Sequence, residues 1–119
     1  MIKLGKDQEI GIDLVEIDRF RKKNFSENQS FYEKIFTKSE ISYCKKFIDP
    51  YPHFAGKFAL KEAAQKSINE NFIFNKIETY HINSKPKIKI VNQGKKYEFF
   101  ASISHENKYA IAIAISKQN

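Results

Sequence analysis

Apolar and polar residues alternate with a period of two in two parts of the chain. Near the start, residues 9–17 read EIGIDLVEI, so the isoleucines fall on one face and Asp13 on the other. From Ile77 onward, four short alternating runs are separated by the turn sequences NSKP, NQGKK and ENK. Because successive strand residues point to opposite faces, this pattern predicts an N-terminal strand and a C-terminal antiparallel meander of four strands.

The residues between these strands are spaced as in helices. Residues 18–36 mix charged and aromatic side chains, with a break predicted near residues 24–30, where Asn and Ser are frequent. The sequence TKSE at residues 37–40 fits a capping box, which predicts a helix from there to about Phe47.

Residues 54–67, FAGKFALKEAAQKS, spread apolar side chains around nearly the whole circumference of a helix. Such an Ala-rich helix is usually buried. The last alternating run has an alanine face that can accept a close neighbour such as this helix, and we therefore expect both faces of the sheet to be covered. The order of strand, helices and antiparallel sheet predicts an α+β fold, with one domain over residues 1–119.

Four charged residues interrupt the apolar helix. Glu62 and Lys66 lie one turn apart in the order that favours a salt bridge, whereas Lys57 and Lys61 lie one turn apart and repel each other. Two explanations fit these residues equally. Either a salt bridge forms and the other lysines extend to water, or the helix borders an anion site with a carboxylate at its edge.

The composition is that of a folded domain with a basic surface. Of the 119 residues, 41% are hydrophobic, and the formal net charge is +7. Such a charge fits a nucleic acid, a phosphorylated cofactor or an acidic protein as partner, or a merely solvated surface. The apolar runs are too short to span a membrane and the start lacks an export signal, so we expect a cytoplasmic protein. Cys44 is the single cysteine, which excludes an internal disulfide.

Two carboxylates occupy apolar surroundings in the predicted elements, Asp13 in a strand and Glu62 in a helix. A buried charge without a partner is costly, so both need cations. Lys66 could pair with one of them, whereas an Mg²⁺ ion shared with a substrate phosphate would neutralise both, and the lysines of the helix would then face the phosphates. His105 ends a predicted strand just before a turn, where ligand-binding groups are frequent, although an isolated histidine there is more often structural.

Five segments resemble, in order and spacing, the holo-[acyl carrier protein] synthases, a family of 4'-phosphopantetheinyl transferases. They are GIDLVEIDR at 11–19, FTKSEISYC at 36–44, FAGKFALKEAAQKS at 54–67, KPKI at 85–88 and SISHENKYAIAIAI at 102–115. The resemblance implies a 4'-phosphopantetheinyl transferase-like fold and the transfer of 4'-phosphopantetheine from coenzyme A to a serine of apo-acyl carrier protein, with release of adenosine 3',5'-bisphosphate. It also implies Mg²⁺ dependence and a homotrimer with active sites between subunits.

Position by position, the resemblance gives Asp13 and Glu62 the role of metal ligands. Glu62 and Lys66 are the expected catalytic residues. We hypothesise that Glu62, directly or through a metal-bound water, takes the serine proton and that Lys66 stabilises charge on the phosphate. Contacts to coenzyme A are expected from four residues: Lys57, Lys61, Lys66 and His105.

The sequence RFRKK suits the acidic helix that is typical of carrier proteins, and Arg19 matches an arginine that faces the carrier protein in the family. We expect this docking surface to act mainly on the association rate. Its basic residues are Arg19, Arg21, Lys22 and Lys23.

The chain departs from the family at three places. Lys57 stands where the family commonly has an arginine, the stretch after Lys66 is free of glycine, and Ser84 replaces a common turn glycine. Lysine cannot form the bidentate phosphate contact of an arginine. This departure and the missing glycine after Lys66 both concern how the nucleotide end of coenzyme A is held.

A basic nucleic-acid-binding module is the alternative, because lysines surround four aromatic residues of the predicted strands: Tyr97, Phe99, Phe100 and Tyr109. Strand alternation argues against it, since Phe99 and Phe100 must point to opposite faces. We therefore expect coenzyme A and acyl carrier protein as partners, and neither a nucleic acid nor a membrane. The remaining histidines, His53 and His81, are interpreted as packing or surface residues.

Overall fold

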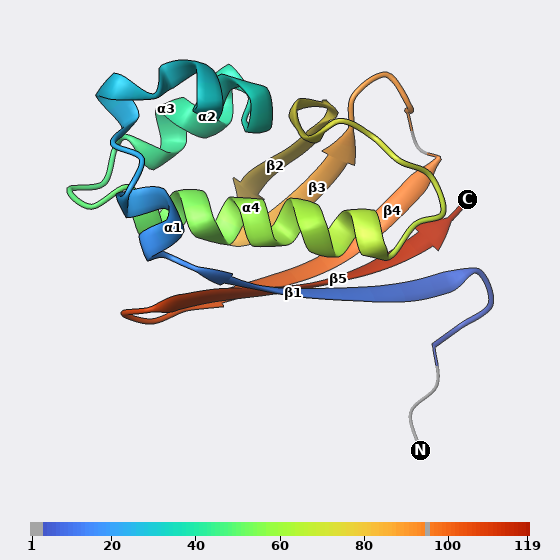
Figure 1. Ribbon diagram of the computed structural model, residues 1–119. Helices are drawn as coiled ribbons and strands as arrows, with labels where there is room; N and C mark the ends of the chain where they lie inside the picture. Colours follow the sequence, from blue (N-terminus) through green and yellow to red (C-terminus); the bar gives the residue numbers. More distant parts are fainter. Residues whose placement is uncertain (1–3, 95) are drawn as a thin grey trace.

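The computed structural model describes residues 4–94 and 96–119, so Lys95, and with it part of the NQGKK turn, lies outside the described residues. Figure 1 shows a long helix lying across a three-stranded sheet, with shorter helices and a hairpin packed around it. The elements in chain order are β1 (Gln8–Glu16), α1 (Asp18–Arg21), a 3-10 turn (Phe25–Glu27), α2 (Gln29–Ile35), α3 (Lys38–Cys44), α4 (Tyr51–Lys66), a second 3-10 turn (Phe74–Lys76), β2 (Ile77–Ile82), β3 (Lys85–Ile90), β4 (Tyr97–His105) and β5 (Tyr109–Gln118).

The strands form two antiparallel sheets in the described part of the chain. In one sheet β5 lies between β1 and β4, and in the other β2 pairs with β3. The four predicted C-terminal strands are confirmed, but the prediction of one meander is wrong. β5 pairs with β4 along one edge and with the N-terminal strand β1 along the other. β2 and β3 pair with each other as a separate hairpin.

One face of the three-stranded sheet packs against α4. Gly11, Asp13 and Val15 turn towards this face together with the alanines of β5, as the alternation predicted. A Cβ atom on Gly11 would lie 2.0 Å from the carbonyl oxygen of Ala63. Only glycine therefore permits this approach of β1 to α4, which brings the charged residues of the strand and the helix close together.

The opposite face of this sheet is apolar and exposed, which corrects the expectation that both faces are covered. Ile12 and Leu14 of β1 are 57% and 60% exposed, and Phe100 of β4 is 59% exposed. The helices all lie on the other side of this sheet in Figure 1, so they leave these residues uncovered in a single chain. We call this surface the exposed sheet face and define it by Ile10, Ile12, Leu14, Phe100 and Ile111.

The helices between the strands follow the sequence signals. Thr37 and Glu40 form the predicted capping box at the start of α3, although the helix ends at Cys44 rather than near Phe47. The break predicted near residues 24–30 is confirmed by the 3-10 turn between α1 and α2. Among the described residues, no helix combines the length and the apolar character that crossing a bilayer requires.

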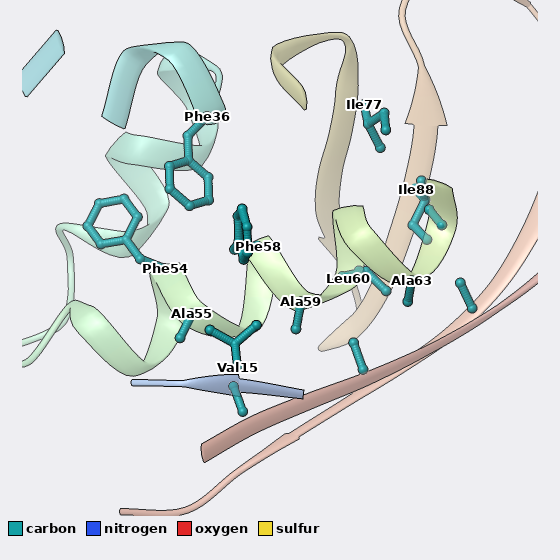
Figure 2. Packing of buried hydrophobic residues seen from close by; sticks show 14 of the residues in the cluster. Val15, Phe36, Phe54, Ala55, Phe58, Ala59, Leu60, Ala63, Ile77 and Ile88 are labelled. Carbon is teal, nitrogen blue, oxygen red and sulfur yellow. The ribbon is translucent and has the colours of Figure 1, made fainter. Parts of the chain in front are cut away.

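The long helix α4 is buried on almost every side, as its sequence predicted. Figure 2 shows Phe36, Phe54 and Phe58 on one side of α4 and Val15 on the side that faces the sheet. The rings of Phe36 and Phe54 are 5.0 Å apart between centroids. Packing on opposite sides fixes the rotation of α4 about its axis, and so it fixes the directions in which the charged side chains of this helix point.

Candidate active site

Asp13, Glu62 and Lys66 meet between β1 and the C-terminal half of α4. The Lys66 ammonium lies 3.1 Å from the Asp13 carboxylate and also donates a hydrogen bond to the carbonyl oxygen of Ile12. Asp13 points towards α4 because strand alternation turns it away from the exposed sheet face. Glu62 lies one helical turn before Lys66, so both side chains leave α4 on the same side.

Glu62 lies in surroundings that favour its protonated form. Partial burial raises the pKa of Glu62 above its ordinary value, and the neighbouring Asp13 carboxylate raises it further. Lys66 and Arg19 lower the pKa of Glu62 but do not cancel these effects. The two carboxylates are thus close enough to interact, and burial together with Asp13 outweighs the effect of the two cations on Glu62.

The first of the two explanations that the sequence left open, a salt bridge between Glu62 and Lys66, is not supported by the structure. Among the ion pairs within residues 4–94 and 96–119, Lys66 pairs with Asp13 and not with its helix neighbour Glu62. A carboxylate pair with one cation suits a divalent ion, because Mg²⁺ binds one or two carboxylates and keeps several waters. Within these residues no group of three His, Cys, Asp or Glu side chains could hold a metal ion, so a metal bound by Asp13 and Glu62 would need further ligands from water and a substrate.

Arg19 extends this site towards α1. Its guanidinium lies 5.0 Å from the centre of the Phe58 ring, a distance at which an aromatic face attracts a cation. Arg19 also lowers the pKa of Glu62. The predicted docking residue is therefore exposed beside the Phe58 ring and lies within electrostatic reach of Glu62.

The other three basic residues of RFRKK have different surroundings. Arg21 forms ion pairs with Asp18 and Asp49, so its charge is largely balanced within the chain. Lys22 and Lys23 are exposed, and the Lys23 ammonium lies over an aromatic ring. The positive surface near α1 is smaller than the four basic residues of RFRKK suggest, because the sequence did not indicate the pairing of Arg21 with a distant aspartate.

Lys57 and Lys61 point elsewhere, towards β2 and α3. Lys61 is fully buried, with its ammonium 2.6 Å from the Glu40 carboxylate. Lys57 donates hydrogen bonds to the carbonyl and hydroxyl oxygens of Thr79. The expectation that both lysines face the phosphates is not supported by these contacts, because acceptors of the chain itself occupy both ammonium groups.

Glu40 explains the buried lysines, and sequence reasoning missed it. One of its carboxylate oxygens accepts hydrogen bonds from Lys61 and from the Thr37 N–H, and the other accepts from the N–H and hydroxyl of Thr79. Burial lowers the pKa of Lys61, and Glu40 counteracts this effect. The TKSE motif already accounted for Glu40 as a helix cap, so no signal in the sequence linked it to a lysine 21 residues away.

His105 lies at the opposite end of α4 from Lys66. Its ring is 5.5 Å from the ring of His53, which belongs to the first turn of α4. Lys66 is the last residue of this helix, about 20 Å away at 1.5 Å of rise per residue. A single chain therefore does not bring His105 to the three residues at the other end.

The aromatic residues behind the nucleic-acid alternative do not share one face. Phe99 packs against the core, whereas Phe100 lies on the exposed sheet face. Tyr97 is partly buried and donates a hydrogen bond to Glu70. Base stacking on a strand surface needs several aromatic faces on the same side, and these residues do not provide them.

Comparison with known proteins agrees with this fold. A family model described as the 4'-phosphopantetheinyl transferase superfamily matches residues 9–114. The holo-[acyl-carrier-protein] synthase of Thermodesulfovibrio yellowstonii is 36% identical over 109 residues, which are 89% of this chain and 95% of that protein.

Solved structures show the same similarity. The Helicobacter pylori holo-[acyl-carrier-protein] synthase, in complex with coenzyme A, has 33% sequence identity and a TM-score of 0.78, covering 91% of this chain and 99% of that one. The Bacillus anthracis synthase, in complex with CoA (3',5'-ADP), has 27% identity and a TM-score of 0.79, covering 93% and 96%. The predicted fold class is thus confirmed. The chain belongs to the 4'-phosphopantetheinyl transferase superfamily and, within it, to the holo-[acyl-carrier-protein] synthase family.

Proposed function

We propose that the protein transfers 4'-phosphopantetheine from coenzyme A to a serine of apo-acyl carrier protein and releases adenosine 3',5'-bisphosphate. The observation that carries this proposal is the meeting of Asp13, Glu62 and Lys66 in a chain of this family. Two carboxylates and a cation beside an open surface can hold a metal and a diphosphate together.

Mg²⁺ fits this site on physical grounds. The pKa of Glu62 is raised partly by Asp13, and a divalent cation between the two carboxylates would relieve this repulsion. Asp13 and Glu62 would hold the ion, and Lys66 would turn from Asp13 to a phosphate oxygen. When bound, Mg²⁺ would neutralise charge on the diphosphate and help the adenosine bisphosphate to leave.

In the proposed step, the serine oxygen forms a bond to the phosphorus of phosphopantetheine, and the bond from this phosphorus to the adenosine bisphosphate oxygen breaks. The serine proton passes to Glu62, directly or through a water. Lys66 balances the charge that develops on the phosphate oxygens.

The carrier protein would dock beside α1. Arg19 is the residue best placed for this contact, because it lies near Glu62 and is held against Phe58. Lys22 and Lys23 add exposed positive charge, which raises the rate of association with an acidic helix more than the final affinity.

The proposed active enzyme is a homotrimer with sites between subunits. Two observations support an assembly: the exposed sheet face is apolar, and His105 lies far from Lys66 within one chain. Contiguous apolar patches on a surface commonly mark protein interfaces. A neighbouring subunit could cover this face and bring its own His105 to the phosphates.

Intact mass spectrometry of the carrier protein tests the proposed function. With coenzyme A and Mg²⁺ we expect each apo-carrier protein to gain the mass of one phosphopantetheine, and we expect EDTA to abolish the gain and excess Mg²⁺ to restore it. Lys66→Ala should lower kcat about 100-fold, the effect of removing one electrostatic contact to a transition state. Lys89→Ala, on the exposed side of β3, is the matched control and should keep the rate. The proposal is abandoned if purified, folded protein gives no mass gain under these conditions.

A further inference from the structure

A cavity of about 750 Å³ opens between α2, α3 and the second 3-10 turn. This volume lies within the ~300–1,000 Å³ that is usual for sites of drug-sized ligands. None of its described lining residues belongs to β1 or α4, so the cavity is separate from the site of Asp13, Glu62 and Lys66. In Figure 1, α2 and α3 lie on the opposite side of α4 from the three-stranded sheet. We call it the α3 cavity, because one side of that helix lines it with Lys38, Ile41, Ser42 and Lys45.

The base of the α3 cavity is apolar. The Phe36 side chain is buried, and Phe25 and Ile41 are partly buried and pack against the core. These residues come from the first 3-10 turn, the end of α2 and the middle of α3. Because three separate segments meet here, the apolar base is continuous, and a ligand that covers it would remove apolar surface from water.

Positive charge surrounds this base. The described lining residues include four lysines and one acid, Glu33, an excess of three positive charges. Within residues 4–94 and 96–119, no ion pair involves any of these lysines. Grouped cations without acidic partners raise the local concentration of anions. The four lysines are Lys38, Lys45, Lys46 and Lys76.

One of these charges lies at the border between the basic and apolar parts of the cavity. The Lys45 ammonium is 4.5 Å from the centre of the Phe25 ring, a distance at which an aromatic face attracts a cation. A ligand with an apolar part on Phe25 would therefore have a positive charge directly beside it.

Asn75 adds a polar atom that lacks a partner. This residue lines the cavity, and its Oδ1 atom is buried without a hydrogen-bond partner among the described residues. A buried acceptor in this state is unfavourable. A water that donates one hydrogen bond to this oxygen and the other to a bound anion would satisfy both acceptors.

We propose that the α3 cavity binds a small amphiphilic anion, a molecule with an alkyl chain and a single anionic head group. The chain would cover Phe25, Phe36 and Ile41, and the head group would lie among the lysines. An inorganic anion would leave the apolar base exposed to water, and an uncharged chain would leave the lysines without a partner. Alkyl carboxylates and alkyl phosphates share the required chemistry. This inference does not depend on the proposed function, because the two sites have no residue in common.

Isothermal titration calorimetry with decanoate, below the concentration at which it forms micelles, tests the proposal. We expect saturable binding with one site per chain. Acetate, which has the head group alone, and decyltrimethylammonium, which has the same chain and a positive head group, should each bind at least about tenfold more weakly. Decyl phosphate separates the two kinds of head group, since the one that the lysines favour should bind more tightly.

Two variants change the cavity in different ways. Lys45→Glu/Lys76→Glu reverses two charges of the lining and should weaken decanoate binding about tenfold. Ser42→Trp leaves the charge unchanged and should block the cavity by filling it. All three positions are exposed, so both variants should melt near the wild-type temperature. Lys6→Glu/Lys87→Glu is the matched control, because it changes the net charge equally at exposed positions outside the lining and should bind decanoate as the wild type does.

The inference is overturned if decanoate does not bind, if decyltrimethylammonium binds as tightly, or if Lys45→Glu/Lys76→Glu and Ser42→Trp both bind decanoate as the wild type does. It is equally overturned if coenzyme A displaces decanoate while these variants have no effect, because decanoate would then occupy a different site. Failure of the proposed transfer reaction would leave the binding result standing, since no measurement here depends on transfer.

Discussion

Partial burial and a neighbouring carboxylate disfavour the ionised form of Glu62, whereas the proposed chemistry needs this form. Partial burial and Asp13 raise the pKa of Glu62. A carboxyl group whose pKa is raised on folding favours the folded state at low pH, and this contribution is lost as the pH rises through the raised value. At neutral pH the ionised Glu62 therefore destabilises the protein in the absence of a metal.

We predict that Glu62→Gln raises the melting temperature at pH 7 while it abolishes transfer. The gain should be small, about 2–3 °C in a domain of this size, because the side chain is partly exposed to solvent. It should disappear below pH 4.5, the ordinary pKa of the group, where the wild-type carboxyl is also protonated. Mg²⁺ should raise the melting temperature of the wild type and not that of the variant. Differential scanning calorimetry measures these shifts, with Glu27→Gln in an exposed turn as control; equal melting curves at pH 7 would contradict the prediction.

The individual site residues could be predicted as far as their role depends on local pattern. Strand alternation alone gives the direction of Asp13, and helical spacing alone puts Glu62 and Lys66 on one side of a helix. The partners of Lys57 and Lys61 could not be found in this way, because Glu40 and Thr79 come from elements whose placement depends on the packing of the whole core. Local sequence determines the direction in which a side chain leaves its own helix or strand. It does not determine which residues of other elements that side chain contacts.

Among the secondary-structure elements, α4 has the central position. It carries charged residues on two sides, and these two strips of residues contact different parts of the chain. One strip faces β1 with Glu62 and Lys66, and the other is anchored to α3 and β2 through Lys61 and Glu40. Besides Glu40, the ammonium of Lys61 reaches the carbonyl oxygens of Ile35 and Phe74. The buried strip therefore ties three parts of the chain to α4 and holds the helix in the rotation that presents the other strip to the sheet.

We predict that Lys61→Met lowers the free energy of unfolding by about 3–5 kcal/mol, because it leaves the Glu40 carboxylate buried without its cation. Glu40→Gln should lower the free energy of unfolding by a similar amount, because it leaves the buried Lys61 ammonium without its carboxylate. The double variant should cost less than the sum of the two by about 2 kcal/mol or more, since neither charge then remains unpaired. Urea unfolding measures all three values.

The more exposed pair of Lys96 and Glu70 serves as the control for this cycle. Its coupling should be below about 1 kcal/mol, as is usual for ion pairs at a surface. Strictly additive effects at Glu40 and Lys61 would show that the buried pair does not hold α4 in place.

The arrangement of the elements was less predictable than the elements themselves. Turn sequences and alternation identified β2, β3, β4 and β5, but they contain no information on which strand takes the free edge of β5. That choice depends on Gly11, which lets β1 lie directly beneath α4. The pairing with β1 then gives the sheet a broad isoleucine-rich face that the helices leave uncovered in Figure 1.

The proposed homotrimer would bury the exposed sheet face between copies of the chain, and this gives the last prediction. Ile12 and Leu14 are more than half exposed, and each apolar side chain that is fully buried in an interface contributes about 1.5–3 kcal/mol. Light scattering should therefore give a mass of three chains for the wild type and one for Leu14→Glu. The variant should lose transfer activity, because His105 would no longer reach a neighbouring Lys66, yet its Asp13–Glu62 site should still bind Mg²⁺. A charged substitution away from this face, Lys22→Glu, should keep the trimer. A wild-type protein that is monomeric and fully active would show that one chain completes the site alone.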